Sequence, residues 1–355
     1  MEIRALVVGA SGLSGRGVSE AFLETGATVF GLSRHSDGLV DGVQHLGADA
    51  LGEKSLGTAL DGLKPTHVCL AIWIRRATEK ENIKTNAGIV RHVLEAAARE
   101  KSVKHVALIT GLKHYLGPFE SYARTGTLPM TPVREEHPRL ATPNFYYSQE
   151  DELYAAAERH GFTWSVHRPH TMIGKAIGNA MNMGTTLAAF ASLCKERGRP
   201  FRFPGSAAQW NGVTDVTDAR VLGKQVVWAS TEDRAKNDAY NTANGDVFRW
   251  NWLWPRIADW FGVQWIGFEK EPAPLEAQME DCGPIWKTLA SRHRLVEASL
   301  DRIASPWHTD LDLGRPLEVV TDMGLSRKRG FLIYQSTEDS FRDLFAQLRQ
   351  DRVIP

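Results

Sequence analysis

The chain contains little cysteine: three residues in 355, at Cys69, Cys194 and Cys282. Three scattered thiols form neither a disulfide framework nor a spaced metal site, so we expect reduced cysteines, no bound metal and a cytoplasmic protein. Charge of one sign is not in excess either, because 42 Lys and Arg balance 42 Asp and Glu. A net charge near zero argues against a broad surface for nucleic acid.

Long apolar runs are absent as well. No window approaches the roughly 18 apolar residues of a membrane-spanning helix, and we expect no signal peptide, since its basic, apolar and small-residue stretches are missing. There is no internal repeat, and 43% of the residues are hydrophobic. The composition predicts a globular protein with a full core and no membrane partner.

A short apolar run and three glycines open the chain. Residues 4–8 (RALVV) have the length of a buried strand, and a helical pattern follows over 17–25. Strand, glycine turn and helix form the context of a dinucleotide-binding fingerprint, with phosphates at the helix N-terminus. The spacing here is G-x-x-G-x-x-G, and a plain turn is the alternative. The candidate cofactor-binding residues are Gly9, Ser11, Gly12, Leu13 and Gly15.

Strands and helices alternate through the first half of the chain. We predict strands over 28–34, 42–51, 66–72, 103–110 and 162–169, and helices over 55–63, 82–101 and 144–157. This alternation predicts an α/β fold of the Rossmann type, with a doubly wound parallel sheet.

The second half does not continue this alternation. We predict helices over 181–195, 218–230 and 340–348, strands within 201–218 and over 238–243, and a tryptophan cluster between 250 and 265 that is mostly core. These segments predict a smaller, mostly helical C-terminal lobe over the carboxyl edge of the sheet, where substrates bind. The expected boundaries are 1–175 for the nucleotide-binding domain, to which 205–245 partly returns, and 176–204 with 246–355 for the substrate lobe.

The end of the second predicted strand bears on the choice of cofactor. An acidic residue there would bind the 2′-hydroxyl of NAD and repel a 2′-phosphate, but the chain has Ser33, Arg34 and His35. A hydroxyl and a guanidinium suit a phosphate, so we expect NADPH and NADP+. The alternative is that Arg34 is a solvated charge. Asp49, after the third predicted strand, either faces the adenine or is a turn or N-cap residue.

Further candidates follow the later strands, at the edge of the sheet that faces the ligand. Trp73 follows the fourth strand and is either a pocket wall or a cap on the core. Thr110 and Gly111 end the fifth strand, and Lys113 beyond them either points into the crevice or is a surface lysine in a loop. Residues 169–171 (Pro169, His170 and Thr171) end the sixth strand, where the nicotinamide is expected.

The glycine turn resembles the extended short-chain dehydrogenase/reductase superfamily, in which a catalytic tyrosine is usually followed four residues later by lysine. Here Glu150 stands four residues after Tyr146, and Asp151 four residues after Tyr147. A nearby anion raises the pKa of a phenol instead of lowering it. By this pattern alone the active site is missing.

Four longer motifs resemble the progesterone 5β-reductase/iridoid synthase-like enzymes: TGLKHYLGPFESY at 110–122, NFYY at 144–147, WSVHRP at 164–169 and NGDVFRW at 244–250. The resemblance runs nearly end to end. In that family the lysine comes from the loop after the fifth strand, so the resemblance implies that Lys113 and Tyr146 are the catalytic pair. It also implies an atypical member of the superfamily that uses NADPH to reduce enones.

The implied reaction gives each residue a role. Hydride adds to the β-carbon of C=C–C=O, and negative charge develops on the carbonyl oxygen. The Tyr146 phenol would stabilise that charge as a hydrogen-bond donor. Lys113 would lower the pKa of the phenol and would also hold the cofactor ribose.

The presumed substrate end departs from the plant-type pattern, because His170 and Thr171 stand where we expect a glycine and often an asparagine. The candidate pocket residues are Trp73, Tyr147, His170, Met181 and Trp307; plain core is the alternative for the two tryptophans and the methionine. The expected partner is a small-molecule enone, and a homodimer is an option. Rival functions are a 1,2-carbonyl reductase, a sugar-nucleotide epimerase and a regulatory protein that senses NADP without turnover.

Overall fold

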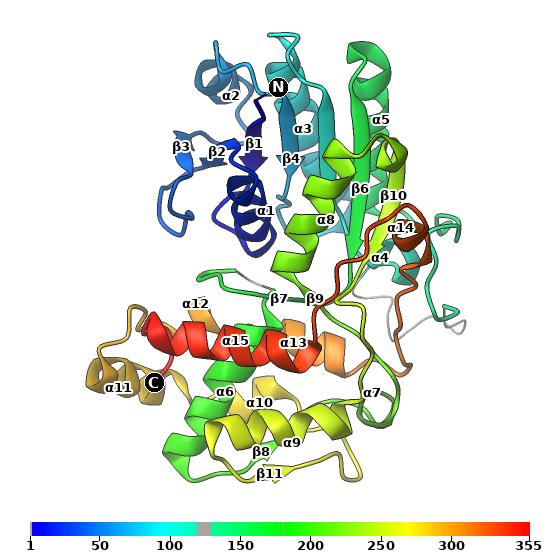
Figure 1. Cartoon of the computed structure of the whole chain (residues 1–355). Coiled ribbons are helices and arrows are strands. Elements are labelled where there is room, and N and C mark those ends of the chain that lie inside the picture. The colour runs from blue at the N-terminus through cyan, green and yellow to red at the C-terminus, as the bar shows by residue number, and fades with distance from the viewer. Residues whose placement is uncertain (1, 119–128, 180) are drawn as a thin grey trace.

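The computed structural model describes residues 2–118, 129–179 and 181–355. Figure 1 shows a sheet flanked by helices above a mostly helical part. The elements of the upper part are β1 (Arg4–Val8), α1 (Leu13–Glu24), β2 (Thr28–Ser33), β3 (Gln44–Gly47), α2 (Glu53–Leu60), β4 (His67–Leu70), α3 (Glu79–Ala98), β5 (His105–Ile109), α4 (Lys113–Leu116), α5 (Phe145–His160), β6 (Thr163–Pro169), α8 (Ala219–Thr231), the 3₁₀ turn η2 (Asp233–Ala235), β10 (Asp238–Thr242) and α14 (Gly324–Lys328).

The sheet has seven parallel strands in the order β10-β6-β5-β4-β1-β2-β3. One apolar cluster joins the sheet to α2, α3 and α5, and another joins it to α1 and α8, so both faces are covered. The strand order reverses direction at β1, and ligands bind beyond the carboxyl ends of the strands at such a point. The predicted Rossmann-type fold is confirmed.

The first helix begins earlier than the predicted 17–25. It starts at Leu13, because Gly12 is its extended N-cap residue and Gly15 lies within its first turn. Of the glycines that the sequence pattern assigns to the turn, Gly15 therefore lies inside the helix and Gly12 lies at its start. The third strand is shorter than the predicted 42–51, with four residues.

Two glycines let α1 and α8 pack at very close range. A Cβ on Gly17 would overlap the carbonyl oxygen of Ala219, and a Cβ on Gly223 would overlap the carbonyl oxygen of Gly17. Gly15 is equally restricted, since a Cβ there would overlap the carbonyl oxygen of Gly9. The glycine turn is thus held in place by a helix from the second half of the chain.

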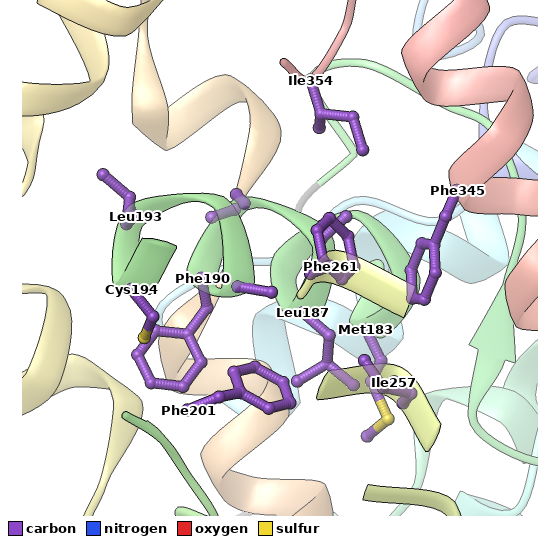
Figure 2. Packing of buried hydrophobic residues seen from close by; sticks show 14 of the residues in the cluster. Met183, Leu187, Phe190, Leu193, Cys194, Phe201, Ile257, Phe261, Phe345 and Ile354 are labelled. Atoms are coloured by element: carbon purple, nitrogen blue, oxygen red, sulfur yellow. The ribbon is translucent and has the colours of Figure 1, made fainter. Parts of the chain in front are cut away.

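The lower part is built around α6, whose residues Met183 to Cys194 are all buried (Figure 2). Leu187, Phe190 and Phe261 lie together in this cluster. The elements of this part are β7 (Met172–Ile173), α6 (Met183–Arg197), β8 (Phe201–Arg202), α7 (Ala207–Asn211), β9 (Thr217–Asp218), α9 (Trp250–Phe261), β11 (Trp265–Ile266), α10 (Leu275–Met279), α11 (Gly283–His293), α12 (Leu300–Ile303), α13 (Pro306–Leu313) and α15 (Thr337–Gln350).

The tryptophan cluster is only partly core. Trp250 and Trp254 are fully buried, whereas Trp252 and Trp265 are exposed and Trp260 is half-buried. Three of the five therefore lie in or against the core, as predicted for most of them, and the other two do not. Residues 250–261 form the amphipathic helix α9, in which residues four apart share a face and residues two apart do not.

A chain of hydrogen-bonded histidines lies buried between the central strands. His105 Nε2 is 3.0 Å from Ser165 Oγ, which is 3.0 Å from His167 Nε2. His167 Nδ1 is 2.8 Å from Gln225 Oε1 on α8, so this nitrogen donates. Burial lowers the pKa of both rings, and that of His167 falls to about 4.

This depressed pKa predicts acid sensitivity of the fold. Below the ordinary histidine pKa of about 6.5 the unfolded chain takes up a proton that folded His167 refuses until about pH 4. Stability should therefore fall as the pH drops through this window, by about 3 kcal/mol from His167 alone, since each pKa unit corresponds to about 1.4 kcal/mol. Chemical denaturation at a series of pH values measures the slope.

Replacing His167 by glutamine should make the free energy of unfolding less dependent on pH, by the contribution of roughly one proton taken up on unfolding. His293 is an exposed histidine on α11, and its replacement by glutamine is the matched control that should leave the slope unchanged. If stability depended on pH equally in both variants, His167 would not be the source of the acid sensitivity.

Candidate active site

The glycine turn lies at the carboxyl end of β1. Gly9 has a φ of +83°, and a Cβ there would stand 2.6 Å from the Ala71 carbonyl oxygen after β4, so glycine is required. The Gly12 amide donates to the Gly9 carbonyl. A Cβ on Gly12 would meet this oxygen at 3.3 Å and Asn179 Nδ2 at 3.8 Å among the described atoms. Gly12 is the N-cap residue of α1, and the N-terminus of a helix favours an anion such as a phosphate.

Ser33, Arg34 and His35 follow β2 at the same edge of the sheet. The Ser33 hydroxyl donates to the His35 carbonyl oxygen (2.6 Å), and the Arg34 and His35 side chains are exposed. Asp49, beyond β3, accepts a hydrogen bond from the Leu51 amide (3.0 Å) and is part of a turn. Its proposed contact with adenine stays a prediction.

The Tyr146 hydroxyl lies where β5 and β6 end. A Cβ on Gly111 would be 3.4 Å from this hydroxyl and 3.3 Å from the Pro169 carbonyl oxygen, so glycine leaves room for the ring. Asn144 caps α5 by accepting from the Tyr146 amide (3.0 Å). Its amide group also donates to the Lys113 carbonyl oxygen (2.8 Å), which ties the tyrosine helix to the lysine loop.

Lys113 points into an aromatic cage. Its Nζ lies 4.8 Å from the ring centre of Phe145, 5.0 Å from that of Trp73 and 5.9 Å from that of Tyr146. The Trp73 and Phe145 rings stack at 5.1 Å. Because Lys113 is only 6% exposed, these ring faces stabilise its charge in place of water. Tyr146, Lys113 and Trp73 thus come together although they lie far apart in the sequence.

The Tyr147 side chain contacts the backbone of α4, the short helix that carries Lys113. Its hydroxyl donates to the His114 carbonyl oxygen (2.6 Å) and accepts from the Leu140 amide (2.9 Å). The hydroxyl predicted to face substrate is therefore engaged by two backbone groups.

Glu150 is 1% exposed and surrounded by cationic side chains. Its Oε2 accepts from Arg139 (2.8 Å), its Oε1 accepts from Arg168 (3.3 Å), and His114 Nδ1 lies 3.6 Å from Oε1. Burial alone would raise the pKa of this carboxyl, but His114, Arg168 and Arg139 together lower it. Burial lowers the pKa of His114. Glu150 is therefore a carboxylate beside a neutral histidine.

His170 and Thr171 join β6 to α13 and the residues after it. His170 Nδ1 lies 2.7 Å from Asp215 Oδ1, and Arg315 donates to His170 Nε2 (2.8 Å). Thr171 donates to Asp312 (2.7 Å), which also pairs with Arg315. Sequence reasoning missed Asp215, Asp312 and Arg315, because no local pattern marks partners that lie 45 to 145 positions apart.

Helix α13 also presents an aromatic residue to the upper part. The Arg75 guanidinium lies 4.4 Å from the ring centre of Trp307. Burial lowers the pKa of His308, the next residue of α13. Met181 is half-buried, and its amide donates to Asn179; within the described residues it makes no hydrogen bond to the residues of the aromatic cage.

Residues 119–122, which end the first family motif, lie outside the described residues. Within the described ranges, no helix has the length and hydropathy to cross a bilayer. No three histidine, cysteine or acidic side chains of the same ranges are grouped as metal ligands would be.

The sequence matches the family model of the PRISE-like Rossmann-fold domain over residues 39–355. The chain belongs to this family. It is 33% identical over 363 residues to an (S)-8-oxocitronellyl enol synthase of Nepeta cataria, covering 99% of this chain and 93% of the relative. It is 32% identical over 365 residues, with the same coverage, to a 3-oxo-Delta(4,5)-steroid 5-beta-reductase of Arabidopsis thaliana. The predicted family is confirmed.

Solved structures share the fold of this PRISE-like chain at low identity. A UDP-glucose 4-epimerase of Thermotoga maritima aligns with a TM-score of 0.69 at 15% identity, covering 98% of this chain and 99% of the other. A UDP-glucose 4-epimerase of Thermus thermophilus, in complex with NAD, aligns with a TM-score of 0.66 at 16% identity and the same coverage. At such identity the likeness establishes the fold alone.

Proposed function

We propose that the protein is an NADPH-dependent oxidoreductase that reduces the C=C bond of activated enones by 1,4-hydride addition. The observation that carries this proposal is the meeting of Tyr146 and Lys113 at the ends of β5 and β6, although the chain lacks a lysine four residues after the tyrosine. The steroid reductase relative supports the reaction type, since its name describes a double bond next to a 3-oxo group.

The residues of the chain stabilise the charge that this reaction creates. NADPH, when bound, supplies the hydride, and the N-terminus of α1 at Gly12 would hold its pyrophosphate. The Tyr146 hydroxyl donates a hydrogen bond to the substrate carbonyl oxygen as the enolate forms. The Lys113 ammonium, held in its aromatic cage, strengthens this donor and binds the cofactor ribose.

We assign cofactor binding to residues at the carboxyl ends of the strands: the turn over 9–15, residues 33–35, Asp49, residues 110–111, Pro169 and Thr171. We assign the substrate pocket to Trp73, Tyr147, His170, Met181 and Trp307. Residues 1–175 with 205–245 form the nucleotide-binding domain, and 176–204 with 246–355 form the substrate lobe. Separate apolar clusters in the two parts support two cores, whereas Met323 and Phe331 of the proposed lobe pack with Val221 and Ala243 of the upper part. All three cysteines are buried and free, which supports a reducing compartment such as the cytoplasm.

The preference for NADPH depends on Arg34 in this proposal. Replacing Arg34 by alanine should lower the ratio of kcat/KM for NADPH to that for NADH by about 10- to 100-fold, because one hydrogen-bonded charge contributes about 1.5–3 kcal/mol. Steady-state kinetics with both cofactors measure the ratio. Arg91, which pairs with Glu152 away from the site, is the matched control; an unchanged ratio in the Arg34 variant would point to another phosphate ligand.

Product analysis tests the reaction itself. NADPH oxidation is followed with 2-cyclohexen-1-one and with progesterone, and the products are identified by mass spectrometry and NMR. A saturated ketone as product supports enone reduction. The ratio of the rates with the small cyclohexenone and the large steroid indicates the size of the substrate pocket. An allylic alcohol would identify a 1,2-carbonyl reductase that uses the same Tyr146 and Lys113. Tight NADPH binding without turnover of any enone would favour a sensor.

A further inference from the structure

The helix that carries Lys113 is too short to be stable without contacts to the rest of the protein. α4 spans four residues, Lys113–Leu116, and a single isolated turn is unstable because nucleation costs more than one hydrogen bond returns. Yet Lys113, His114 and Tyr115 are each at most 6% exposed. Something outside α4 must therefore fix the position of the lysine.

Helix α5 supplies contacts that hold the backbone of α4 in place. Asn144, its N-cap residue, donates to the Lys113 carbonyl oxygen, and Tyr147 donates to the His114 carbonyl oxygen. The His114 ring is packed edge-on against Tyr147 at 5.2 Å, with Glu150 Oε1 3.6 Å from its Nδ1. Glu150 thus occupies the helix position where the superfamily has lysine, and it faces the loop that supplies the lysine here.

Glu150 also reaches α4 through Arg168. One arm of the Arg168 guanidinium donates to Glu150 (3.3 Å) and the other donates to the Tyr115 hydroxyl (3.0 Å). That hydroxyl donates in turn to Asn241 on β10 (2.7 Å). The carboxylate therefore fixes Tyr115 through Arg168 and lies beside the His114 ring, so it reaches two successive residues of α4 directly after the lysine.

We propose that Glu150 is a positioning residue for Lys113, which it holds through His114 and through Arg168 and Tyr115. This inference rests on the proposed function, in which Lys113 acts on Tyr146 and the cofactor. A displacement of about 1 Å in such a group can cost about 100-fold in rate. The alternative role is purely structural: Glu150 neutralises the buried Arg168 and has no particular effect on the lysine.

A double-mutant cycle separates the two roles. Glu150→Gln keeps the shape of the side chain and removes its charge. It should lower kcat by about 10- to 100-fold in the native chain, but by less than about twofold in a Lys113→Met background, where no lysine remains to be positioned. Equal losses in both backgrounds would overturn the proposal.

Asp151 provides the matched control. It is the next residue, and it binds the same Arg139 (2.7 Å), but its side chain is 62% exposed and, among the described residues, it makes no hydrogen bond or ion pair with α4. Asp151→Asn should therefore keep the native kcat. If Glu150→Gln does not fold, His114→Asn replaces it in the cycle, because it breaks the contact with Glu150 and leaves the carboxylate between its two arginines.

Amide hydrogen exchange gives a readout that needs no substrate. In Glu150→Gln the amides of residues 114–117 should exchange at least about tenfold faster, whereas those of α5 should not change; in Asp151→Asn neither should change. Unchanged exchange at 114–117 would overturn the proposal. If the native chain reduces no enone, the proposed function fails, and the exchange result alone decides whether Glu150 holds the lysine loop.

Discussion

Replacing Tyr146 by phenylalanine should slow enone reduction by about 100- to 1,000-fold, which is the usual cost of one lost oxyanion donor. The ring keeps its place beside Gly111 and the aromatic cage, so the affinity for NADPH should not change. Single-turnover kinetics at saturating enone measure the chemical step, and fluorescence titration measures cofactor binding.

Tyr147→Phe is the control for this experiment. Its hydroxyl binds the His114 carbonyl and the Leu140 amide, so its loss should loosen α4 and reduce the rate less than the loss of the Tyr146 hydroxyl. If the Tyr146 variant kept nearly full activity and the Tyr147 variant did not, we have assigned the donor to the wrong tyrosine.

A methyl group on Gly223 should destabilise the fold by about 3 kcal/mol or more. The new Cβ would overlap the backbone of Gly17 on α1, and neither helix backbone can yield as a flexible side chain would, so the cost lies at or above the upper end of ordinary overpacking. Urea denaturation measures the free energy of unfolding. Cofactor binding should weaken as well, because α1 begins at the glycine turn.

Gly88 on α3 is the matched control, since no described atom lies within 4 Å of a Cβ placed there. Gly88→Ala should be neutral or stabilising by about 0.5–1 kcal/mol, because alanine favours a helix more than glycine does. Equal stability of the Gly223 and Gly88 variants would show that α1 and α8 can separate without cost.

The sheet could be predicted because its signals are local. Apolar runs of strand length, separated by helical patterns and glycines, placed the strands of the upper part in chain order. Helix starts were less accurate: α3 begins at Glu79 and not at residue 82, although Thr78 and Glu81 form a capping box that the sequence displays as T-x-x-E. The helices α10, α12 and α14 have only four or five residues each and carry too few turns for a periodic pattern.

The site could be predicted only where a motif marked it. The pairing of Lys113 with Tyr146 came from family motifs, because nothing in the spacing of two residues 33 positions apart shows that they meet. The buried ions around His170 and Glu150 had no such marker. The spacing marks Glu150 only as a residue that stands where lysine is expected, whereas its two arginine partners come from a loop and a strand and the neutral His114 beside it comes from a one-turn helix.

The sheet is completed late, and this sets the order in which the chain can fold during synthesis. Its edge strand, β10, ends at Thr242, and α8, which covers the glycines of α1, ends only shortly before it. By then α6 has already left the ribosome, although its partner α15 is the last helix made. The nascent chain therefore carries two unfinished apolar cores at once, and we expect it to need chaperones that shield both until release.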